Sequence, residues 1–454
     1  MKYCTAGESH GPALVTIISD VPAGFELTES MINQDLKRRQ SGYGRGKRME
    51  IEMDRVEMLS GVRFGKTLGT PIALKITNRD WEAWQERMAL QGDPPSDLKL
   101  EQSPRPGHAD LVGSLKIGTL DCRDVLERAS ARETAARVAA GAVAKAWLAN
   151  FGVTISSYVI RIGDVEFPAS GTSSSSSTST SIGSSSSSST GSSTGSKSGN
   201  PESPTSGSSS STGTNTSTGS SSSTGSSSST GSAPGNPEPL YSTDEIEASP
   251  VRCPSKEASA LMVAAIDAAR EAGESLGGWF VLTATGLVPG IGGYAEAKDR
   301  LTGRIGGALF SIPAIKGVEF GLGFAAGTLP GSMVHDPIII TERAGRFGRI
   351  GRASNNAGGL EGGMTTGEPL IIRVAMKPIP TLQKALQTID LVTHEVKDAS
   401  KERSDICAVP AAAVVGEAEL AMILADAYMD KFGRDCLIDA KQSYKSYTQR
   451  INAR

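Results

Sequence analysis

A low-complexity tract divides the sequence and sets the main limit on what the chain can fold into. From Ser170 to Gly235 nearly every residue is Ser, Thr or Gly, and the tract runs into PGNPEP. Because it has few apolar side chains to offset the entropy lost when a backbone is ordered, such a tract cannot build a hydrophobic core. We therefore predict that residues 170–235 are disordered.

Three arrangements explain a tract of this kind: an insertion within one domain, a linker between two independent domains, or a glycosylated or partner-binding stalk. The glycine-rich and basic motifs described below are divided between both sides of the tract, so neither half looks self-sufficient. The penalty for closing a loop also grows only with the logarithm of its length. We favour a single domain over residues 1–454 that carries the tract as an insertion.

Composition and charge exclude several classes of protein. The formal net charge is −3, which argues against a general nucleic-acid or membrane-surface binder. No run of 18 apolar residues and no basic, apolar leader occur, so we expect a cytoplasmic protein without membrane spans. The sequence has five cysteines and no CxxC spacing, which favours reduced thiols over disulfides or a zinc site.

Helical and strand patterns both occur outside the tract, which predicts an α+β or α/β chain. TPIALKIT (70–77) alternates apolar and polar residues like a half-buried strand, and ALVTII (13–18) also reads as a strand. TESMINQDLKRR (28–39) predicts an amphipathic helix capped by Thr28. Residues 254–273 and 416–433 predict two more helices, each closed by a glycine suited to the left-handed conformation.

The stretch GESHG (7–11) matches G-x-S-x-G, the pattern of a serine-hydrolase elbow. An elbow needs a helix after the serine, yet a predicted strand follows here, so we disfavour Ser9 as a nucleophile. His10 is then the residue of interest. The chain has only four histidines, and their spacing forms no metal motif.

Two basic stretches could bind an anion. Lys37–Arg48 contains several cationic side chains close to glycines. Its arginines could hold an anionic small molecule, but a solvated turn and RNA binding are alternative interpretations. RASARETAARVAAGA (128–142) contains an S-x-x-E capping box, Ser130 and Glu133, beside two arginines. Its helix N-terminus is either a phosphate site or a capped core helix, and this stretch alone does not decide.

Further stretches carry residues able to do chemistry. RPGHAD (105–110) places His108 in a turn with an arginine and an aspartate, and a structural role for this histidine remains open. The glycines of NNAGGLEGGMTTGEPL (355–370) would admit a ligand or form a structural loop. KPIPT (377–381) is extended because of its prolines. In RSDIC (403–407), a surface ion pair between Arg403 and Asp405 is the simplest interpretation.

Taken in order, these motifs closely resemble the chorismate synthase family. The resemblance rests on the following stretches: GESHG, SGYGRGKRMEIEMDRVEMLSGV, TLGTPIAL, RPGHAD, RASARETAARVAAGA, SIPAIKGVEFG, NNAGGLEGGMTTGEP, MKPIPTL and RSDICAVPAAAVVGEA. It covers nearly everything except the tract. Ala129 departs from the family, which commonly has a second serine there, and this could weaken one polar contact to the flavin.

The resemblance implies a β-α-β sandwich fold and a homotetramer. It also implies a lyase of the shikimate route to aromatic amino acids, which removes phosphate from 5-enolpyruvylshikimate 3-phosphate by anti-1,4-elimination and yields chorismate. Reduced FMN is required without net redox. NADPH or a separate flavin reductase would supply its electrons.

Residue roles follow from the same resemblance. His10 would protonate the departing phosphate, His108 would steady the charge of the reduced flavin near N1, and Asp405 would manage the proton at flavin N5. Arg39 and Arg45 match phosphate-ligand arginines that some members assign to NADP. The matching flavin-binding positions are Arg128, Ala129, Ser130, Pro313, Ala314, Gly362, Lys377, Pro378, Ile379, Pro380, Thr381 and Arg403.

Two other classes remain open. A flavin-dependent reductase would use the same contacts but consume NAD(P)H in proportion to product. A non-catalytic anion-binding protein would keep the arginines and tolerate loss of His10 and His108.

Overall fold

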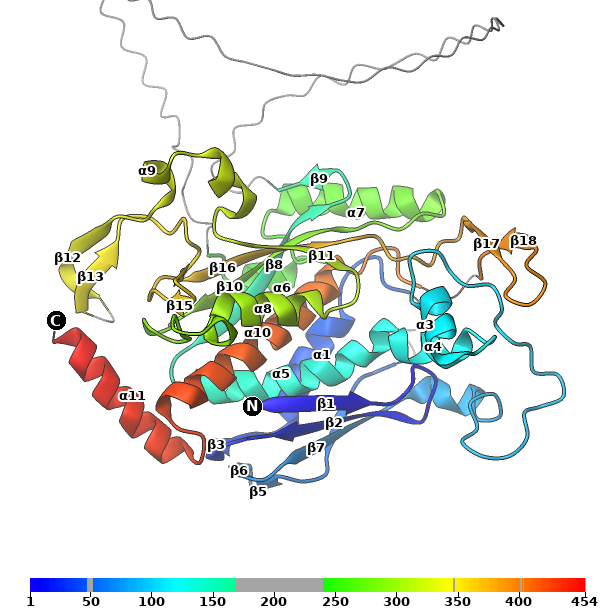
Figure 1. Ribbon diagram of the computed structural model, residues 1–454, viewed down its shortest axis with the longest axis horizontal. Coiled ribbons are helices and arrows are strands. Elements are labelled where there is room, and N and C mark those ends of the chain that lie inside the picture. The colour runs from blue at the N-terminus through cyan, green and yellow to red at the C-terminus, as the bar shows by residue number, and fades with distance from the viewer. Residues whose placement is uncertain (47–51, 168–239, 346–347, 401, 403, 454) are drawn as a thin grey trace, which may run out of the picture. The chain divides into compact units, whose positions relative to one another are not determined.

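The computed structural model describes residues 1–46, 52–167, 240–345, 348–400, 402 and 404–453. These residues combine helices and sheets, which confirms the mixed composition that the sequence predicted (Figure 1). The tract from Ser170 to Gly235 lies outside the described residues. Its disorder and its place within a single domain therefore stay predictions.

Two antiparallel sheets form from residues that precede the tract. The four-stranded sheet has the order β1 (Lys2–Ala6), β2 (Ala13–Ser19), β7 (Ile72–Thr77), β4 (Val56–Met58). The three-stranded sheet has the order β3 (Ala23–Glu26), β6 (Lys66–Leu68), β5 (Val62–Arg63). In β7 the alternate residues Ile72, Leu74 and Ile76 are all buried, which confirms the half-buried strand.

A five-stranded antiparallel sheet joins residues from both sides of the tract. Its order is β11 (Ile315–Phe320), β16 (Leu370–Met376), β10 (Gly278–Thr285), β8 (Thr154–Ile162), β9 (Val165–Glu166). β10 pairs with β8 over most of its length, so the chain before the tract and the chain after it share one ladder of hydrogen bonds. Two-stranded hairpins are β12 (Ile338–Gly345) with β13 (Gly348–Arg352), β14 (Leu360–Glu361) with β15 (Met364–Thr365), and β17 (Gln387–Ile389) with β18 (Val396–Asp398).

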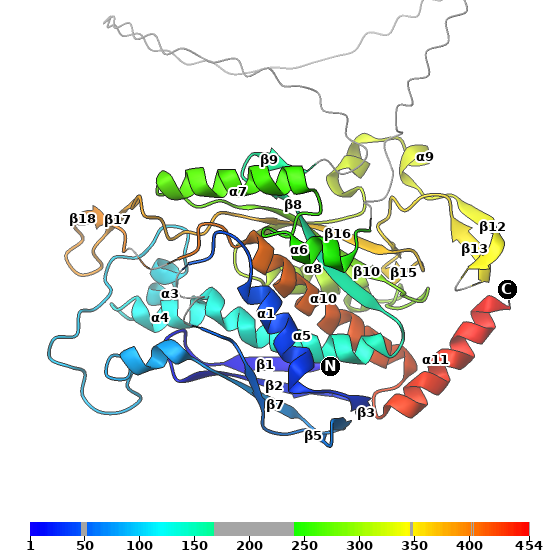
Figure 2. The same cartoon turned by 180° about the vertical axis from the view of Figure 1, so that it is seen from behind.

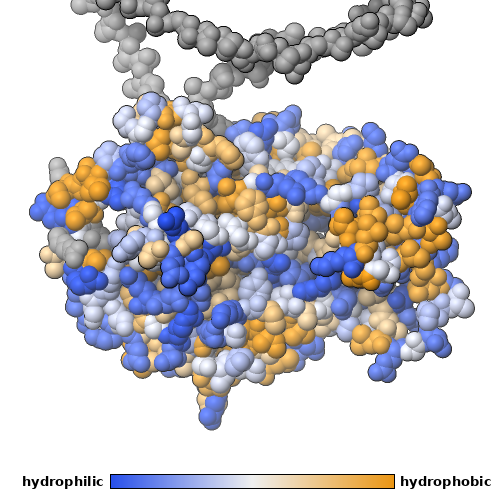
Figure 3. Space-filling model, viewed as in Figure 1, coloured by the Kyte–Doolittle hydropathy of each residue, from blue (hydrophilic) through white to orange (hydrophobic). Residues whose placement is uncertain are grey.

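The helices connect and cover these sheets. They are α1 (Glu29–Gln40), α3 (Asp110–Ile117), α4 (Arg123–Ala129), α5 (Thr134–Ala149), α6 (Thr243–Ala248), α7 (Lys256–Glu271), α8 (Leu301–Phe310), α9 (Gly331–Val334), α10 (Val409–Phe432) and α11 (Leu437–Asn452). Short 3-10 turns are η1 (Arg79–Ala83), η2 (Ala131–Glu133), η3 (Ala297–Asp299) and η4 (Gly323–Thr328). Among the described helices, none is both long and apolar enough to cross a membrane. On the face shown in Figure 3, hydrophilic and hydrophobic residues are intermixed.

Helices α1, α5 and α10 lie between the four-stranded and the five-stranded sheet (Figures 1 and 2). Both α5 and α10 are buried around most of their circumference, as expected for helices that are apolar on all sides. The inward residues of the five-stranded sheet join this core, whereas Tyr158, Ile160, Val281 and Ile371 point outward and pack with Ile246 of α6. The sheet is therefore apolar on both faces.

The closest helix contact in this core joins α5 to α10. A Cβ built on Gly141 would lie 2.3 Å from the Cβ of Ala418, so a side chain at this position would force the two helices apart. Glycine thus permits a helix approach that no other residue allows here.

We expect Gly141→Ala to destabilise the protein by about 1–3 kcal/mol, the usual effect of overpacking, although alanine favours a helix over glycine. Gly303→Ala is the matched control, because the added methyl in α8 would meet open space and should stabilise by about 0.5–1 kcal/mol. Urea unfolding of both variants measures the difference. Equal effects would contradict the steric argument.

Helix boundaries follow the sequence signals with two corrections. Thr28 caps α1 as predicted, accepting a hydrogen bond from the Met31 N–H at 3.4 Å. α10 begins at Val409, well before the predicted start at Gly416, because Pro410 fits the first turn, where its missing N–H is not needed. Gly433 has φ 120° and ψ 147°, so it ends α10 with a positive φ that favours glycine, although outside the left-handed helical region that the sequence predicted.

Candidate active site

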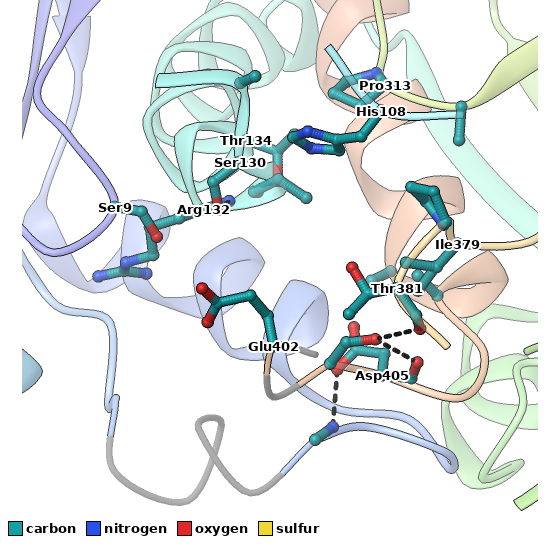
Figure 4. A pocket seen from close by; sticks show the side chains of 18 of the residues that line it. Ser9, His108, Ser130, Arg132, Thr134, Pro313, Ile379, Thr381, Glu402 and Asp405 are labelled. Atoms are coloured by element: carbon teal, nitrogen blue, oxygen red, sulfur yellow. Dashed lines mark hydrogen bonds between the residues drawn. The ribbon is translucent and has the colours of Figure 1, made fainter. Parts of the chain in front are cut away.

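A cavity of about 450 Å³ lies where loops from many elements meet (Figure 4). Its walls come from the loop between β1 and β2, the end of α1, the junction of α4 with α5, the loop before α3, the segment after β16 and the start of α10. Polar and charged residues line it together with apolar ones. The apolar part is formed by Ile312, Pro313, Ala314, Met376, Ile379, Pro380, Ala408, Ala411, Ala412 and Val415.

Most residues singled out from the sequence line this cavity. They are His10, Arg39, Arg45, His108, Ala129, Ser130, Pro313, Ala314, Lys377, Ile379, Pro380, Thr381 and Asp405. Arg128, Gly362 and Pro378 are not among the residues that line it, and Arg403 lies outside the described residues. The structure therefore gathers stretches that are far apart in sequence around one space.

The loop GESHG connects two strands, β1 and β2. No helix follows Ser9, so the strand-to-helix turn of a hydrolase elbow is absent from this loop, as the sequence predicted. The Ser9 N–H donates to the Glu127 carbonyl at 3.0 Å. Ser9 and His10 both line the cavity.

His10 is held on three sides. Its Nδ1 lies 2.9 Å from Glu127 Oε1, and its ring stacks on Trp84 with 4.1 Å between ring centroids. Its Nε2 lies 3.8 Å from Asp80 Oδ2, too far for a hydrogen bond. The side chain is only 10% exposed. Burial raises the pKa of the Glu127 carboxyl, but hydrogen bonds and charge from His10 and Arg123 lower it further, so the net pKa is below the usual value.

His108 contacts a fully buried carboxylate. Its Nδ1 contacts Asp110 Oδ1, and Arg105 pairs with the same carboxylate at 2.8 Å from Nε to Oδ2. Burial raises the pKa of Asp110, but hydrogen bonds from His108 and Arg105 lower it well below its usual range. Asp110 is therefore an anion that supports a positive charge on the imidazole.

The KPIPT segment is tied to the loop that carries His108. Arg105 Nη1 donates to Thr381 Oγ1 at 3.1 Å, and Lys377 Nζ donates to the Gly107 carbonyl at 2.7 Å. Burial, and then the charge of Lys316, lower the pKa of Lys377. Two stretches that the sequence flagged separately thus form one wall of the cavity.

Asp405 pairs with a residue that the sequence did not suggest. Its Oδ2 lies 2.8 Å from Arg45 Nη1, and its Oδ1 accepts the Gly46 N–H at 2.7 Å. The expected ion pair with Arg403 involves a residue outside the described part of the chain. Asp405 is 19% exposed and lines the cavity, so this carboxylate is not a surface group.

Arg39 forms a buried cluster with Arg132 around Asp54. Arg39 Nη1 lies 3.2 Å from Asp54 Oδ2, and Arg132 Nη1 lies 2.5 Å from Asp54 Oδ1. Burial lowers the pKa of Arg39 to about 10, with Asp54 opposing and Arg45 adding to this shift. Arg39 therefore stays cationic at neutral pH, and the cavity wall near it is positive.

The basic stretch 37–48 separates into different environments. Arg39 and Arg45 face the cavity, whereas Arg38 turns inward and forms two hydrogen bonds with the buried Glu417. Residues 47 and 48 lie outside the described part of the chain. A single solvated turn therefore does not describe this stretch.

The predicted capping box at the start of α5 is wrong. Ser130 Oγ accepts from the Arg132 N–H at 3.3 Å and caps η2, and α5 begins only at Thr134. The Glu133 carboxylate bonds Arg137 at 2.8 Å and Thr5 at 2.7 Å, and these stronger charged and side-chain partners draw it from the cap. Arg128 donates to the carbonyls of Thr5 and Gly7 and so ties α4 to the GESHG loop.

The glycines of 355–370 meet the chain itself. A Cβ on Gly358 would lie 2.3 Å from the Gly321 nitrogen, and one on Gly359 would lie 2.5 Å from the Pro369 carbonyl oxygen. Both glycines have positive φ. These contacts favour the structural-loop interpretation for Gly358 and Gly359.

Sequence reasoning missed the partners of His10. Trp84, Glu127 and Asp80 carry no motif of their own, and only Glu127 had a signal, its place directly before the stretch that begins at Arg128. Their roles follow from contacts between segments far apart in the chain. The sequence placed Asp110 and Arg105 beside His108, but it did not predict that these two residues form an ion pair with each other.

The cavity suits a ligand with a flat apolar ring and anionic groups. Its apolar wall can cover a ring, and Arg39, Arg45 and Lys377 supply cations for phosphate. Its volume lies within the usual range for a site of this kind, roughly 300–1,000 Å³. The residues present therefore fit a flavin mononucleotide, and His108 with its carboxylate is suited to an anionic ring.

Comparison with known proteins gives one consistent result. The family model described as chorismate synthase matches residues 1–429. A protein of Aquifex aeolicus named chorismate synthase is 44% identical to this chain, over 100% of this chain and 98% of the relative. A protein of Rubrobacter xylanophilus with the same name is 46% identical, over 99% of this chain and 97% of the relative. A crystal structure of chorismate synthase has 36% identity and a TM-score of 0.67, covering 100% of this chain and 98% of the other.

Proposed function

The chain belongs to the chorismate synthase family, and from this premise we propose that it converts 5-enolpyruvylshikimate 3-phosphate to chorismate and phosphate. The reaction is an anti-1,4-elimination, the last step of the shikimate route, and makes the protein a carbon–oxygen lyase. One observation carries the proposal: two histidines, each bonded to a buried carboxylate, line the same cavity as a cluster of arginines.

One histidine and two arginines act on the leaving phosphate. His10, oriented by Glu127, protonates the phosphate oxygen as the C–O bond breaks, and a positioned general acid contributes on the order of a hundredfold to ten-thousandfold. Arg45 and Arg39 supply the positive charge that holds the phosphate. The hydrogen lost from the substrate ring leaves as a proton, which Asp405 takes up on its carboxylate, and Asp110 holds the His108 ring in place.

Reduced FMN, when bound, would supply electron density for breaking the C–O bond and would recover it, so that the reaction involves no net redox. The residues proposed to hold it are His108, Arg128, Ala129, Ser130, Pro313, Ala314, Gly362, Lys377, Pro378, Ile379, Pro380, Thr381 and Arg403. Ala129 offers no hydroxyl, so Ser130 must supply the polar side-chain contact at this turn. NADPH or a separate flavin reductase would provide the electrons.

The same premise extends to architecture. We propose that the helices between two sheets correspond to the family's β-α-β sandwich and that the protein assembles as a homotetramer. Residues 170–235 would be a disordered insertion within this single domain. Gel filtration with light scattering tests the tetramer.

An anaerobic assay tests the reaction. With 5-enolpyruvylshikimate 3-phosphate and chemically reduced FMN, phosphate and chorismate should appear in equal amounts while the reduced FMN persists. Consumption of reductant in proportion to product would instead support a reductase. Anion binding without turnover, unchanged when His10 and His108 are replaced, would support a non-catalytic binding protein.

Arg45 is proposed to clamp the substrate phosphate. Arg45→Gln should raise KM about tenfold or more, because a hydrogen bond to a charged group contributes about 1.5–3 kcal/mol. Arg45→Lys keeps the charge and should raise KM less. Steady-state kinetics with each variant measure the effect, and an unchanged KM in Arg45→Gln would remove this residue from the phosphate site.

A further inference from the structure

Glu127 holds the His10 loop through side chain and backbone together. Its Oε2 accepts the His10 backbone N–H at 2.7 Å, its Oε1 lies 2.9 Å from His10 Nδ1, and its carbonyl accepts the Ser9 N–H at 3.0 Å. Glu127 is 3% exposed and does not line the cavity. It therefore touches His10 but not the space where a substrate would lie.

The other groups around His10 leave one ring nitrogen available. Trp84 stacks on the ring, and Asp80 lies 3.8 Å from Nε2 without a hydrogen bond. Arg123 lies 3.0 Å from Glu127 Oε1 and 2.9 Å from Glu402 Oε1 on its other side. These contacts fix the Glu127 carboxylate and the plane of the imidazole, while Nε2 can still reach a ligand.

We infer that Glu127 is the positioning residue that fixes the proton of His10 on Nδ1 and so dedicates Nε2 to proton donation. The inference rests on the proposed function, in which His10 is the general acid. The imidazolium gives its Nε2 proton to the phosphate oxygen as the C–O bond breaks, and the electron pair of that bond stays on the oxygen. The neutral imidazole that remains keeps its Nδ1–H hydrogen bonded to Glu127, so the Nδ1 proton is not the proton that is transferred.

An amide at position 127 would reverse this preference. Glutamine has one oxygen and one NH2 group, whereas both Glu127 oxygens now face donors: Oε2 faces the His10 N–H, and Oε1 faces His10 Nδ1 and Arg123 Nη1. If the amide oxygen accepts the backbone N–H, the NH2 group faces Nδ1 and favours the tautomer with its proton on Nε2. It also removes the charge that stabilises the imidazolium.

The inference is tested first without substrate or flavin. In protein labelled with 15N-histidine and titrated until the His10 ring is neutral, the resonances of His10 should show Nδ1–H in the wild type and a shift toward Nε2–H in Glu127→Gln. Glu133→Gln is the matched control, because this carboxylate also sits at the α4–α5 junction but bonds Thr5 and Arg137 and not His10. An unchanged tautomer in Glu127→Gln would overturn the inference.

Kinetics give the second arm. Glu127→Gln should lower kcat about tenfold to a hundredfold, the usual effect of losing an orienting carboxylate, with little change in KM. In a His10→Asn background, Glu127→Gln should lower kcat no further, because the imidazole that Glu127 positions is absent. An additional loss in that background would overturn the inference and leave His10 as the acid. Full activity of His10→Asn itself would overturn both the inference and the acid role of His10.

A second variant covers the case in which Glu127→Gln does not fold. Glu127→Asp keeps the charge but withdraws the carboxylate by one methylene group. It should lengthen the contact with Nδ1, retain the Nδ1–H tautomer and lower kcat less than the amide does. A loss of kcat in Glu127→Asp that persists unchanged in the His10→Asn background would again contradict the positioning role.

Discussion

Asp405→Asn is expected to slow turnover by at least about a hundredfold, the lower end for a group that moves a proton. The amide can still accept the Gly46 N–H, so the loop that carries residue 405 should keep its position. It has no basic oxygen, however, and its NH2 group would face Arg45. Stopped-flow and steady-state assays under anaerobic conditions measure the loss, and flavin titration checks that FMN affinity stays near normal.

Asp390→Asn provides the control for this substitution. Asp390 also accepts backbone N–H groups and pairs with Lys397 at 2.8 Å, but it lies between β17 and β18 and is not among the residues lining the cavity. Its variant should keep full turnover. Near-normal turnover of a folded, flavin-bound Asp405→Asn protein would show that Asp405 serves only to hold Arg45 and Gly46.

Glu417→Gln is expected to destabilise the protein by about 3–5 kcal/mol, the usual cost of removing one partner from a buried ion pair. Glu417 of α10 is fully buried and meets three cations: Arg38 at 2.7 Å, Lys145 at 2.7 Å and Arg252 at 3.3 Å. Ser157 Oγ also donates to it at 2.6 Å. The amide would leave these cations without their shared anion. Urea unfolding at neutral pH measures the loss.

The effect should also depend on pH. Burial raises the pKa of Glu417, but the charges of Lys145, Arg38 and Arg252 lower it further, to well below the value of 4.5 for a free carboxyl. A carboxyl whose pKa is lower in the folded than in the unfolded state stabilises fully above the unfolded value, and this stabilisation is lost as the pH falls. The difference between wild type and Glu417→Gln should therefore shrink below pH 4.5.

Glu57→Gln is the control for the buried network. Glu57 pairs with the partly exposed Lys75 at 3.0 Å and is itself 59% exposed, so its loss should cost under about 1 kcal/mol. A cost for Glu417→Gln as small as this, or one that does not change with pH, would show that the cations around Glu417 find other partners.

Local structure and family membership were predictable from the sequence. The alternation of Ile72, Leu74 and Ile76 and the cap at Thr28 depend on neighbours within a few residues, so their patterns are visible in a short stretch. The order of the motifs also predicted the family, and most of the site residues assigned from that resemblance line the cavity. Their individual roles stay predictions.

Tertiary structure alone decided the pairing of charged groups. Glu127 meets His10, Arg45 meets Asp405 and Arg38 meets Glu417 across separations of 117 to 379 residues. A hydrogen bond depends on a distance of about 3 Å between two atoms, and no local pattern records which distant segments the fold brings that close. Glu133 left its predicted cap partly for the same reason, since Thr5 becomes its neighbour only after β1 packs against α5. Its other partner, Arg137, is a local pair four residues further along the chain.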